Sequence, residues 1–169
     1  LLKKVNEDLT HNKKLLAESS EKVNADPADY IASLNAGNAL LGLGDFDKAI
    51  EMYNSTIANV TSKDESSEGV VPQGDARYTS THKDAALGAK AMWGIGSALN
   101  QKGDYEGSVD AYNDALKEAE ATDPSNKGLI AYIKSGLADS QYKLGNKEGA
   151  VDSLNQAKEL KKQADTDNK

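Results

Sequence analysis

The sequence predicts an all-α protein that forms an α-α superhelix, with three helical hairpins stacked behind an N-terminal helix. Three observations lead to this prediction. The chain has 169 residues, which is enough for one domain with a core. It has 14 glycines, three prolines and only 5% aromatic residues, a content that fits small-residue packing between helices better than packed strands. A glycine followed by Asp or Asn also recurs between apolar segments of helical period.

Residues 1–25 form the first predicted helix. Its apolar residues fall on one helical stripe, which consists of Leu2, Val5, Leu9, Leu16 and Val23. Asp26-Pro27 ends the helix, because proline cannot continue it. We expect this helix to cap one open end of the stack, as terminal units of helical repeats do. A coiled-coil dimer through the same stripe is the alternative, although Asn12 and Ser19 interrupt the stripe.

Each hairpin is marked at its turn by a glycine and a polar residue: Gly44-Asp45, Gly103-Asp104 and Gly145-Asn146. The glycine supplies the positive φ that ends one helix, and the Asp or Asn caps the free amides of the next. Small residues recur at fixed positions on both sides of the turn, namely Gly37, Gly96 and Ala138 before it and Ala49, Ser108 and Ala150 after it. Large residues follow four positions later, at Tyr53, Tyr112 and Leu154. We expect the small residues to let the paired helices approach and the large ones to fill the space between them.

This pattern resembles the tetratricopeptide repeat (TPR), a helical hairpin that stacks into a solenoid. The resemblance covers residues 28–163, with repeats at about 30–62, 79–121 and 126–161. The alternative is a set of unrelated hairpins that share an ordinary Gly-Asp turn. The first two turns lie farther apart than the family's repeat length, and the polar, Gly- and Pro-containing residues 62–78 between them predict an exposed loop, either functional or disordered. Residues 164–169 are predicted to be a disordered tail.

Charge and residue content argue against several functional classes. Lys plus Arg number 20 against 27 Asp plus Glu, a net charge of −7, which disfavours a nucleic-acid partner. No apolar run is long enough to insert into a membrane. His11 and His82 stand alone, and the sequence has no cysteine, metal-ligand spacing or phosphate-binding glycine motif. We therefore expect no catalysis, cofactor or metal, and the lack of cysteine and of an initiator Met favours a soluble periplasmic protein of bacteria.

In this family the first helix of each repeat lines a concave surface, and the resemblance implies which residues face it. They are Leu34, Asn35, Asn38 and Leu41 in the first repeat, Lys90, Trp93, Ser97 and Asn100 in the second, and Tyr132, Ser135, Asp139 and Tyr142 in the third. Chaperone-binding members hold a carboxylate here with a clamp of Lys, Asn and Arg. Of that set only Asn38 is present, since Leu34, Gly94, Tyr132 and Gly136 stand at clamp positions. A clamped carboxylate is therefore not expected.

Aromatic and amide side chains stand where the clamp would be. The aromatic residues would offer apolar area with a polar tip, and Asn38 could hydrogen-bond an extended peptide. Gly94 and Gly136 would leave room for the backbone of a ligand, whereas Trp93 could instead complete the core or contact the N-terminal helix. The predicted function is a noncatalytic protein- or peptide-binding module that acts as a scaffold or adaptor. The alternative is a structural subunit that self-associates or packs within a larger complex.

Overall fold

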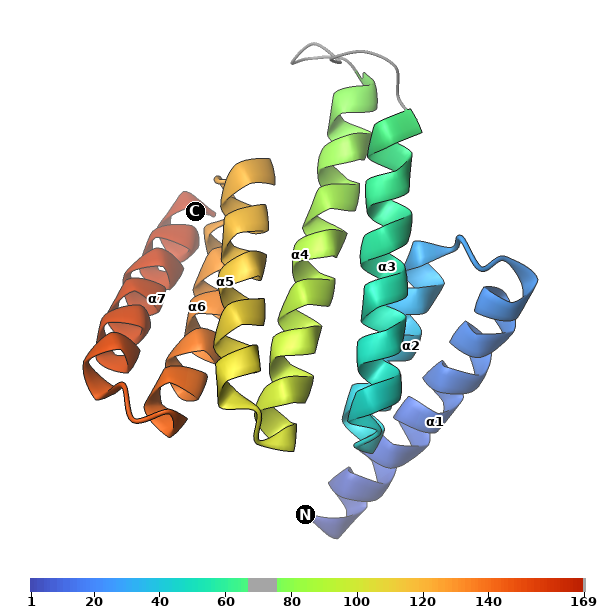
Figure 1. The fold of residues 1–169 in the computed structure, drawn as a ribbon, viewed down its shortest axis with the longest axis horizontal. Coiled ribbons are helices and arrows are strands. Elements are labelled where there is room, and N and C mark those ends of the chain that lie inside the picture. The colour runs from blue at the N-terminus through green and yellow to red at the C-terminus, as the bar shows by residue number, and fades with distance from the viewer. Residues whose placement is uncertain (67–75, 169) are drawn as a thin grey trace.

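The computed structural model describes the backbone of residues 1–66 and 76–168, and the side chains of residues 1–60 and 86–168. The described backbone consists of helices joined by short turns, without strands, which confirms the all-α helical repeat fold. The helices are α1 (Leu2–Ala25), α2 (Tyr30–Leu43), α3 (Phe46–Ser66), α4 (Ala76–Lys102), α5 (Tyr105–Thr122), α6 (Lys127–Lys143) and α7 (Lys147–Asp167) (Figure 1). None of them is both long and apolar enough to span a bilayer.

The three predicted glycine turns are confirmed. Gly44, Gly103 and Gly145 have φ of 81°, 89° and 88°, and no non-glycine residue of the described backbone has a positive φ. The residue after each glycine bonds back to the carbonyl five positions earlier, so that the last turn of the helix closes on itself. The Oδ1 atoms of Asp104 and Asn146 then accept hydrogen bonds from the free backbone amides of Gly107 and Gly149, each at 3.0 Å. Helix ends and turns are thus specified by the residues of the turn alone.

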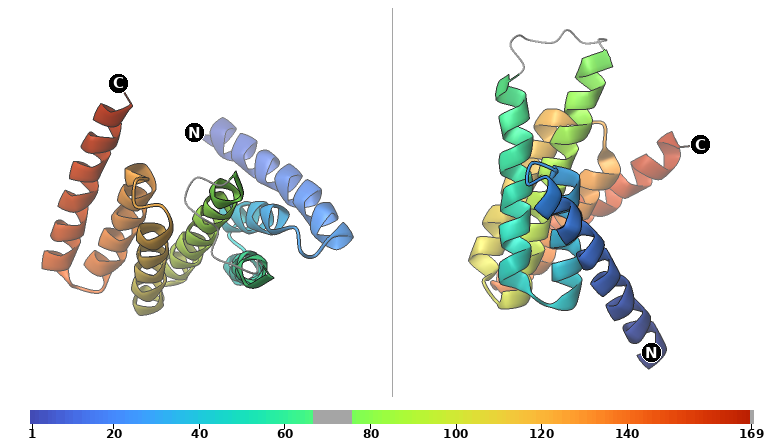
Figure 2. Two further views of the ribbon diagram at one scale, coloured as in Figure 1. Left: turned by 90° about the horizontal axis from the view of Figure 1, so that it is seen from above. Right: turned by 90° about the vertical axis from the view of Figure 1, so that its right-hand side faces the viewer.

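The helices stack side by side into an arc, and both chain ends lie on its open side (Figure 2). Helix α4 packs against both α2 and α3, and α6 packs against both α4 and α5. Each groove between the helices of one hairpin is therefore filled by the first helix of the next. Lys102 on α4 pairs with Asp47 on α3 across one of these contacts. The arrangement gives α2, α4 and α6 the inner side of the arc and α3 and α5 the outer side.

The core of the stack is built around two tyrosines. Tyr53 of α3 is fully buried and Tyr112 of α5 is 4% exposed. A Cβ added at Gly37 would lie 2.7 Å from the ring of Tyr53, and one added at Gly96 would lie 2.9 Å from the ring of Tyr112. The expected pairing of a small and a large residue is therefore observed in the first two repeats, where each tyrosine ring packs against a glycine of the preceding helix. In the third repeat Leu154 remains 41% exposed, so it does not fill such a space.

Burial of these tyrosines predicts an alkaline limit to stability. Desolvation raises the pKa of Tyr112 to about 12, against a smaller lowering by a hydrogen bond with Ser97, and desolvation also raises the pKa of Tyr53. Between pH 10 and 12 the unfolded chain releases these protons while the folded chain retains them. The free energy of unfolding should then fall by up to about 1.4 kcal/mol per pH unit for each tyrosine. Urea unfolding from pH 9 to 11.5 should show a smaller slope in Tyr112→Phe; an unchanged slope would contradict this.

Two predicted unstructured segments are shorter than expected. Helix α3 continues to Ser66 and α4 begins at Ala76, so the ends of the predicted 62–78 loop are helical, while residues 67–75 lie outside the described residues. The two helices pack on each other, and tertiary packing rather than composition accounts for most helix stability in proteins. The expected tail is also wrong for residues 164–167, because α7 runs to Asp167; residue 169 lies outside the described residues. Lys127 Nζ lies 2.7 Å from Asp167 Oδ2 and ties that last turn to the start of α6.

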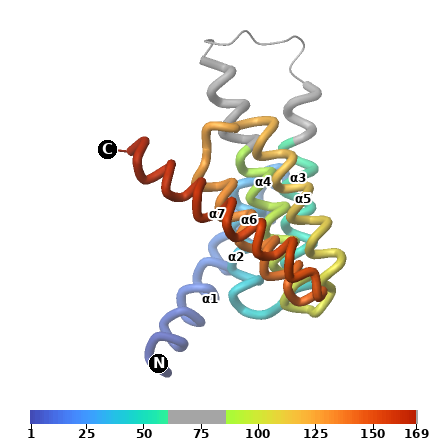
Figure 3. Tube along the Cα trace, turned by 90° about the vertical axis from the view of Figure 1, so that its left-hand side faces the viewer, coloured from blue at the N-terminus to red at the C-terminus, as the bar shows by residue number. Residues whose placement is uncertain are grey.

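Helix α1 covers the first hairpin with only part of its length. It packs on α2, where Leu16 joins the core, Asn12 lies against Gly42 and Ser19 is the one buried residue of the helix. Residues 1–11, which we call the overhang, project away from the stack on the same side as the end of α7 (Figure 3). The predicted apolar stripe is therefore not buried along its whole length: Leu2, Val5 and Leu9 are 80%, 46% and 37% exposed. The reason is length, since α1 has 24 residues and α2 has 14.

Candidate functional site

The inner helices present most of the predicted surface residues to solvent. The exposed ones are Asn38, Lys90, Tyr132, Ser135, Asp139 and Tyr142, and the half-buried ones are Asn35, Leu41, Trp93 and Ser97. Together they form what we call the inner face, which runs across α2, α4 and α6. Leu34 and Asn100 are the exceptions, because only 7% and 8% of each is exposed. Those two residues are not available to a partner in this structure.

Leu34 is buried because it belongs to the core of the first hairpin. It packs in one cluster with Leu40, Ala49, Tyr53 and Ala91, which come from α2, α3 and α4. Successive residues of a helix point about 100° apart, so Leu34 points toward these helices while the next residue, Asn35, is half-buried. Assigning Leu34 to the inner face was therefore wrong.

Trp93 and Tyr132 form an aromatic pair that bridges two repeats. Trp93 lies on α4 and Tyr132 on α6, and their ring centroids are 4.8 Å apart at an interplanar angle of 31°. Trp93 is half-buried and packs against the core of the second and third hairpins, whereas Tyr132 is 57% exposed. The pair thus combines a fixed indole ring with an accessible phenol ring. Trp93 packs against the core, as the structural alternative expected, and its role in binding stays a prediction.

Gly94 and Gly136 do not leave room for a ligand. A Cβ added at Gly94 would lie 2.3 Å from Tyr53 Cζ, and one added at Gly136 would lie 2.6 Å from Tyr112 Cζ. Each buried tyrosine is therefore held between glycines of two successive inner helices. The expectation that these glycines serve the backbone of a bound peptide is wrong, since the space beside them is already filled by aromatic rings.

The hydroxyl groups of the two buried tyrosines bind equivalent residues of the inner helices, each six positions before the turn glycine. Tyr53 Oη donates to Asn38 Oδ1 at 2.8 Å, and Tyr112 is hydrogen-bonded to Ser97. The bond fixes the orientation of the Asn38 amide, so that its NH₂ group is turned away from the tyrosine on an exposed residue. Asp139 occupies the same register in the third repeat, where Leu154 replaces the tyrosine. Core packing and surface chemistry are thus coupled at Asn38 and Ser97.

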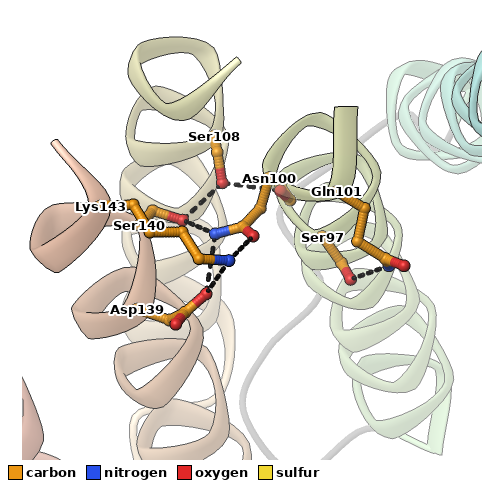
Figure 4. A network of polar contacts seen from close by, with 8 residues as sticks. Ser97, Asn100, Gln101, Ser108, Asp139, Ser140 and Lys143 are labelled. Atoms are coloured by element: carbon orange, nitrogen blue, oxygen red, sulfur yellow. Dashed lines mark hydrogen bonds and ion pairs between the residues drawn. The ribbon is translucent and has the colours of Figure 1, made fainter. Parts of the chain in front are cut away.

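A polar network joins the second and third repeats in addition to the Tyr112 contact (Figure 4). Asn100 Nδ2 donates to Asp139 Oδ2 at 3.0 Å and to Ser140 Oγ at 2.7 Å, while Asn100 Oδ1 accepts from Lys143 Nζ at 2.7 Å. Asn100 therefore uses both donors and its acceptor within the protein. The family resemblance placed Asn100 on the inner face, but all three hydrogen bonds of its amide group are made with residues of α6.

The network extends from α6 to α5 through two serines. Ser108 Oγ donates to the carbonyl oxygen of Gly96 at 2.7 Å and lies 2.7 Å from Ser140 Oγ. Since Ser108 donates to the carbonyl, Ser140 donates to Ser108 and accepts from Asn100. Lys143 also lies 3.0 Å from Asp139 and 5.6 Å from the ring centroid of Tyr105. The sequence pattern identified Ser108 only as a small residue. Ser140 and Lys143 could not be predicted from it, because their contacts with Asn100 and Ser108 join different helices.

A second concave feature lies at the last hairpin, which we call the end groove. It consists of two adjoining cavities of about 510 and 310 Å³ between α6 and α7, which share Ser135 and Leu154. Its lining includes the large side chains of Tyr132, Tyr142 and Val151. Its far end carries the charged residues Lys158, Lys161 and Asp165. The groove overlaps the inner face, since Tyr132, Ser135, Asp139 and Tyr142 belong to both.

Metal-ligating side chains do not converge in the described part of the chain: no three His, Asp or Glu side chains there are placed to hold an ion. His11 is exposed on the overhang. The side chain of His82 lies outside the described residues.

Comparison with known proteins gives one consistent family. A family model described as tetratricopeptide repeat matches residues 15–63 and 73–127, and a second model of that description matches residues 136–160. No curated protein matches the sequence. None of these findings supports a periplasmic location.

Solved structures that are similar to the chain include several of MamA. One, MamA MSR-1 C2, is 18% identical, with 94% of this chain and 95% of that chain covered and a TM-score of 0.37. A crystal structure of MamA is 12% identical, with 89% of each chain covered and a TM-score of 0.38. A third, MamA AMB-1 P212121, is 18% identical, with 93% and 96% covered and a TM-score of 0.35.

Proposed function

Because the chain belongs to the tetratricopeptide repeat family, we propose that it is a noncatalytic scaffold that binds an extended segment or a helix of a partner protein on its inner face. Proteins of this family are typically interaction scaffolds rather than catalysts. The observation that carries the proposal is the Trp93–Tyr132 pair, an accessible aromatic surface on adjacent inner helices. Residues 1–25 act as the terminal helix of the scaffold and residues 28–163 as its repeat domain.

The aromatic pair favours a partner with an apolar anchor. An aromatic ring with one accessible face buries apolar area without losing much side-chain entropy, and Tyr and Trp are enriched among residues that dominate binding energy. Polar groups flank the pair, with Ser97 on α4 and Ser135 and Asp139 on α6. These groups suit the backbone amides of an extended segment. The predicted ligand is therefore a peptide with one large apolar residue between hydrogen-bonding backbone groups.

Rigidity of the inner face also supports a binding role. The polar network around Asn100 ties α4 to α6, and the glycine-held tyrosines fix each inner helix to the outer helices. A surface that is already ordered loses little conformational entropy when a ligand binds, which raises affinity for a given contact area.

Chain composition provides a direct test, since Trp93 is the only tryptophan. Peptides selected from a random phage-displayed library on the wild-type protein should change Trp93 fluorescence on binding. Tyr132→Ala should raise their dissociation constant at least tenfold, because it removes the accessible half of the pair. Leu144→Ala, which truncates an exposed apolar residue at the end of α6, is the matched control. Equal affinity for Tyr132→Ala and wild type, or binding without a fluorescence change, would refute the proposal.

A further inference from the structure

In the described stack, each of the first two hairpins is covered by the first helix of the next hairpin. The last hairpin, which forms the end groove, has no such helix packed against it. Helix α4 fills the groove of α2 and α3, and α6 fills that of α4 and α5. Leu154 stands nine residues after its turn glycine, in the register of Tyr53 and Tyr112. Those tyrosines are buried by the next repeat, but Leu154 is 41% exposed. The groove therefore has the position in the stack and the apolar lining residues of a helix-binding site.

The overhang at the other end of the molecule is a helix with an exposed apolar stripe. Leu2, Val5 and Leu9 lie on one side of it, and all residues from 1 to 11 are exposed. The overhang thus has the properties that the end groove requires of an occupant. Apolar patches of this kind on a protein surface mark interaction sites.

Charges on the two surfaces are complementary in a single orientation. Along α7 the order is Lys158, Lys161 and then Asp165 at the rim of the groove. An incoming helix would run antiparallel to α7, because α6 runs antiparallel to α5: Lys143 meets Tyr105 and Ser140 meets Ser108.

Antiparallel docking brings opposite charges to the same level at two places along the overhang. The acidic residues Glu7 and Asp8 then lie at the level of Lys158 and Lys161. One helical turn toward the N-terminus, the basic residues Lys3 and Lys4 lie at the level of Asp165. Charge patterns that match in this way select partner and orientation.

We propose that the overhang of one copy of this protein docks in the end groove of a second copy, as an additional helix of its stack. Two copies that exchange overhangs close into a dimer, whereas docking in one direction extends a chain of copies. Docking would cover Tyr132, Ser135, Asp139 and Tyr142, which line the groove and also belong to the inner face. The assembly would therefore compete with peptide binding at the Trp93–Tyr132 pair, and sedimentation without peptide tests the assembly separately from the proposed function.

Sedimentation velocity over a concentration series tests this assembly. The wild-type chain should show a mass above the 18.0 kDa monomer at high concentration, and less association at high salt. Lys158→Glu/Lys161→Glu and Glu7→Lys/Asp8→Lys should each weaken self-association at least tenfold. A mixture of these two variants should associate again, since each groove then meets an overhang of opposite charge. This rescue separates charge pairing from a general loss of folding.

Matched controls make the same charge changes away from the contact. Lys147→Glu/Lys162→Glu on α7 and Glu18→Lys/Glu21→Lys on α1 alter exposed residues that do not line the groove. Both controls should associate as the wild type does, and circular dichroism should confirm that all variants keep their helices. A wild-type chain that stays monomeric at every concentration, or a mixture of the two reversed variants that stays monomeric, would overturn the proposal.

Discussion

Replacing Gly94 with alanine should lower the free energy of unfolding by about 3 kcal/mol, although alanine is the better helix former. The new Cβ would lie 2.3 Å from Tyr53 Cζ. The ring cannot move aside, because a Cβ position at Gly37 already lies 2.7 Å from its other side. Overpacking of this kind forces shifts of side chains and backbone, and here it outweighs the roughly 1 kcal/mol that alanine adds to a helix. Chemical denaturation of the variant measures the loss.

Gly88 of the same helix provides the matched control. A Cβ at Gly88 would lie 4.0 Å from Val60, which is ordinary van der Waals contact. Gly88→Ala should therefore raise stability by up to about 1 kcal/mol. Gly94→Ala should also cost less in a Tyr53→Leu background, where the ring is absent, as it naturally is at Leu154. If both glycine variants gained stability, the close packing of Tyr53 would be disproved.

Local features of the fold could be predicted from the sequence because their causes are local. Gly44, Gly103 and Gly145 need only a positive φ, and the capping by Asp104 and Asn146 involves amides three residues away. The periodic recurrence of these turns then defines the hairpins. A repeat is the favourable case for such reasoning, since each hairpin contacts its neighbours in the same way as the last.

Surface assignments were less certain because they depend on contacts between distant residues. Gly94 was assigned to the inner face, but Tyr53, 41 residues earlier, decides what fills the space beside it. Asn100 and Leu41 share one register, yet only Asn100 is buried, because Ser140 and Lys143 of α6 bind its amide. The end of α7 was predicted to be disordered for the same reason. Its polar composition does not reveal the pairing of Lys127 with Asp167, which joins residues 40 positions apart.

Replacing Asn100 with alanine should lower the free energy of unfolding by about 2 kcal/mol. The change removes three hydrogen bonds, of which those to Asp139 and from Lys143 involve charged groups. Water can replace part of this loss at the half-exposed Asp139 and Lys143. It cannot do so at Ser140, which is fully buried and would lose a donor. Denaturant unfolding would measure this cost, and Asn113→Ala, an exposed asparagine on α5, should change stability by less than about 0.5 kcal/mol.

The network also predicts that this loss is shared with Ser140. If Asn100 acts through the buried serine, the double variant Asn100→Ala/Ser140→Ala should cost less than the two single changes added together, because each single change already breaks the hydrogen bond between these two residues. The double variant should also loosen the contact between α4 and α6, and this contact holds Trp93 beside Tyr132. Peptide affinity at the inner face should therefore fall together with stability. Additive costs would instead mean that Asn100 and Ser140 contribute independently, and unchanged peptide affinity would mean that the aromatic pair is held by packing alone.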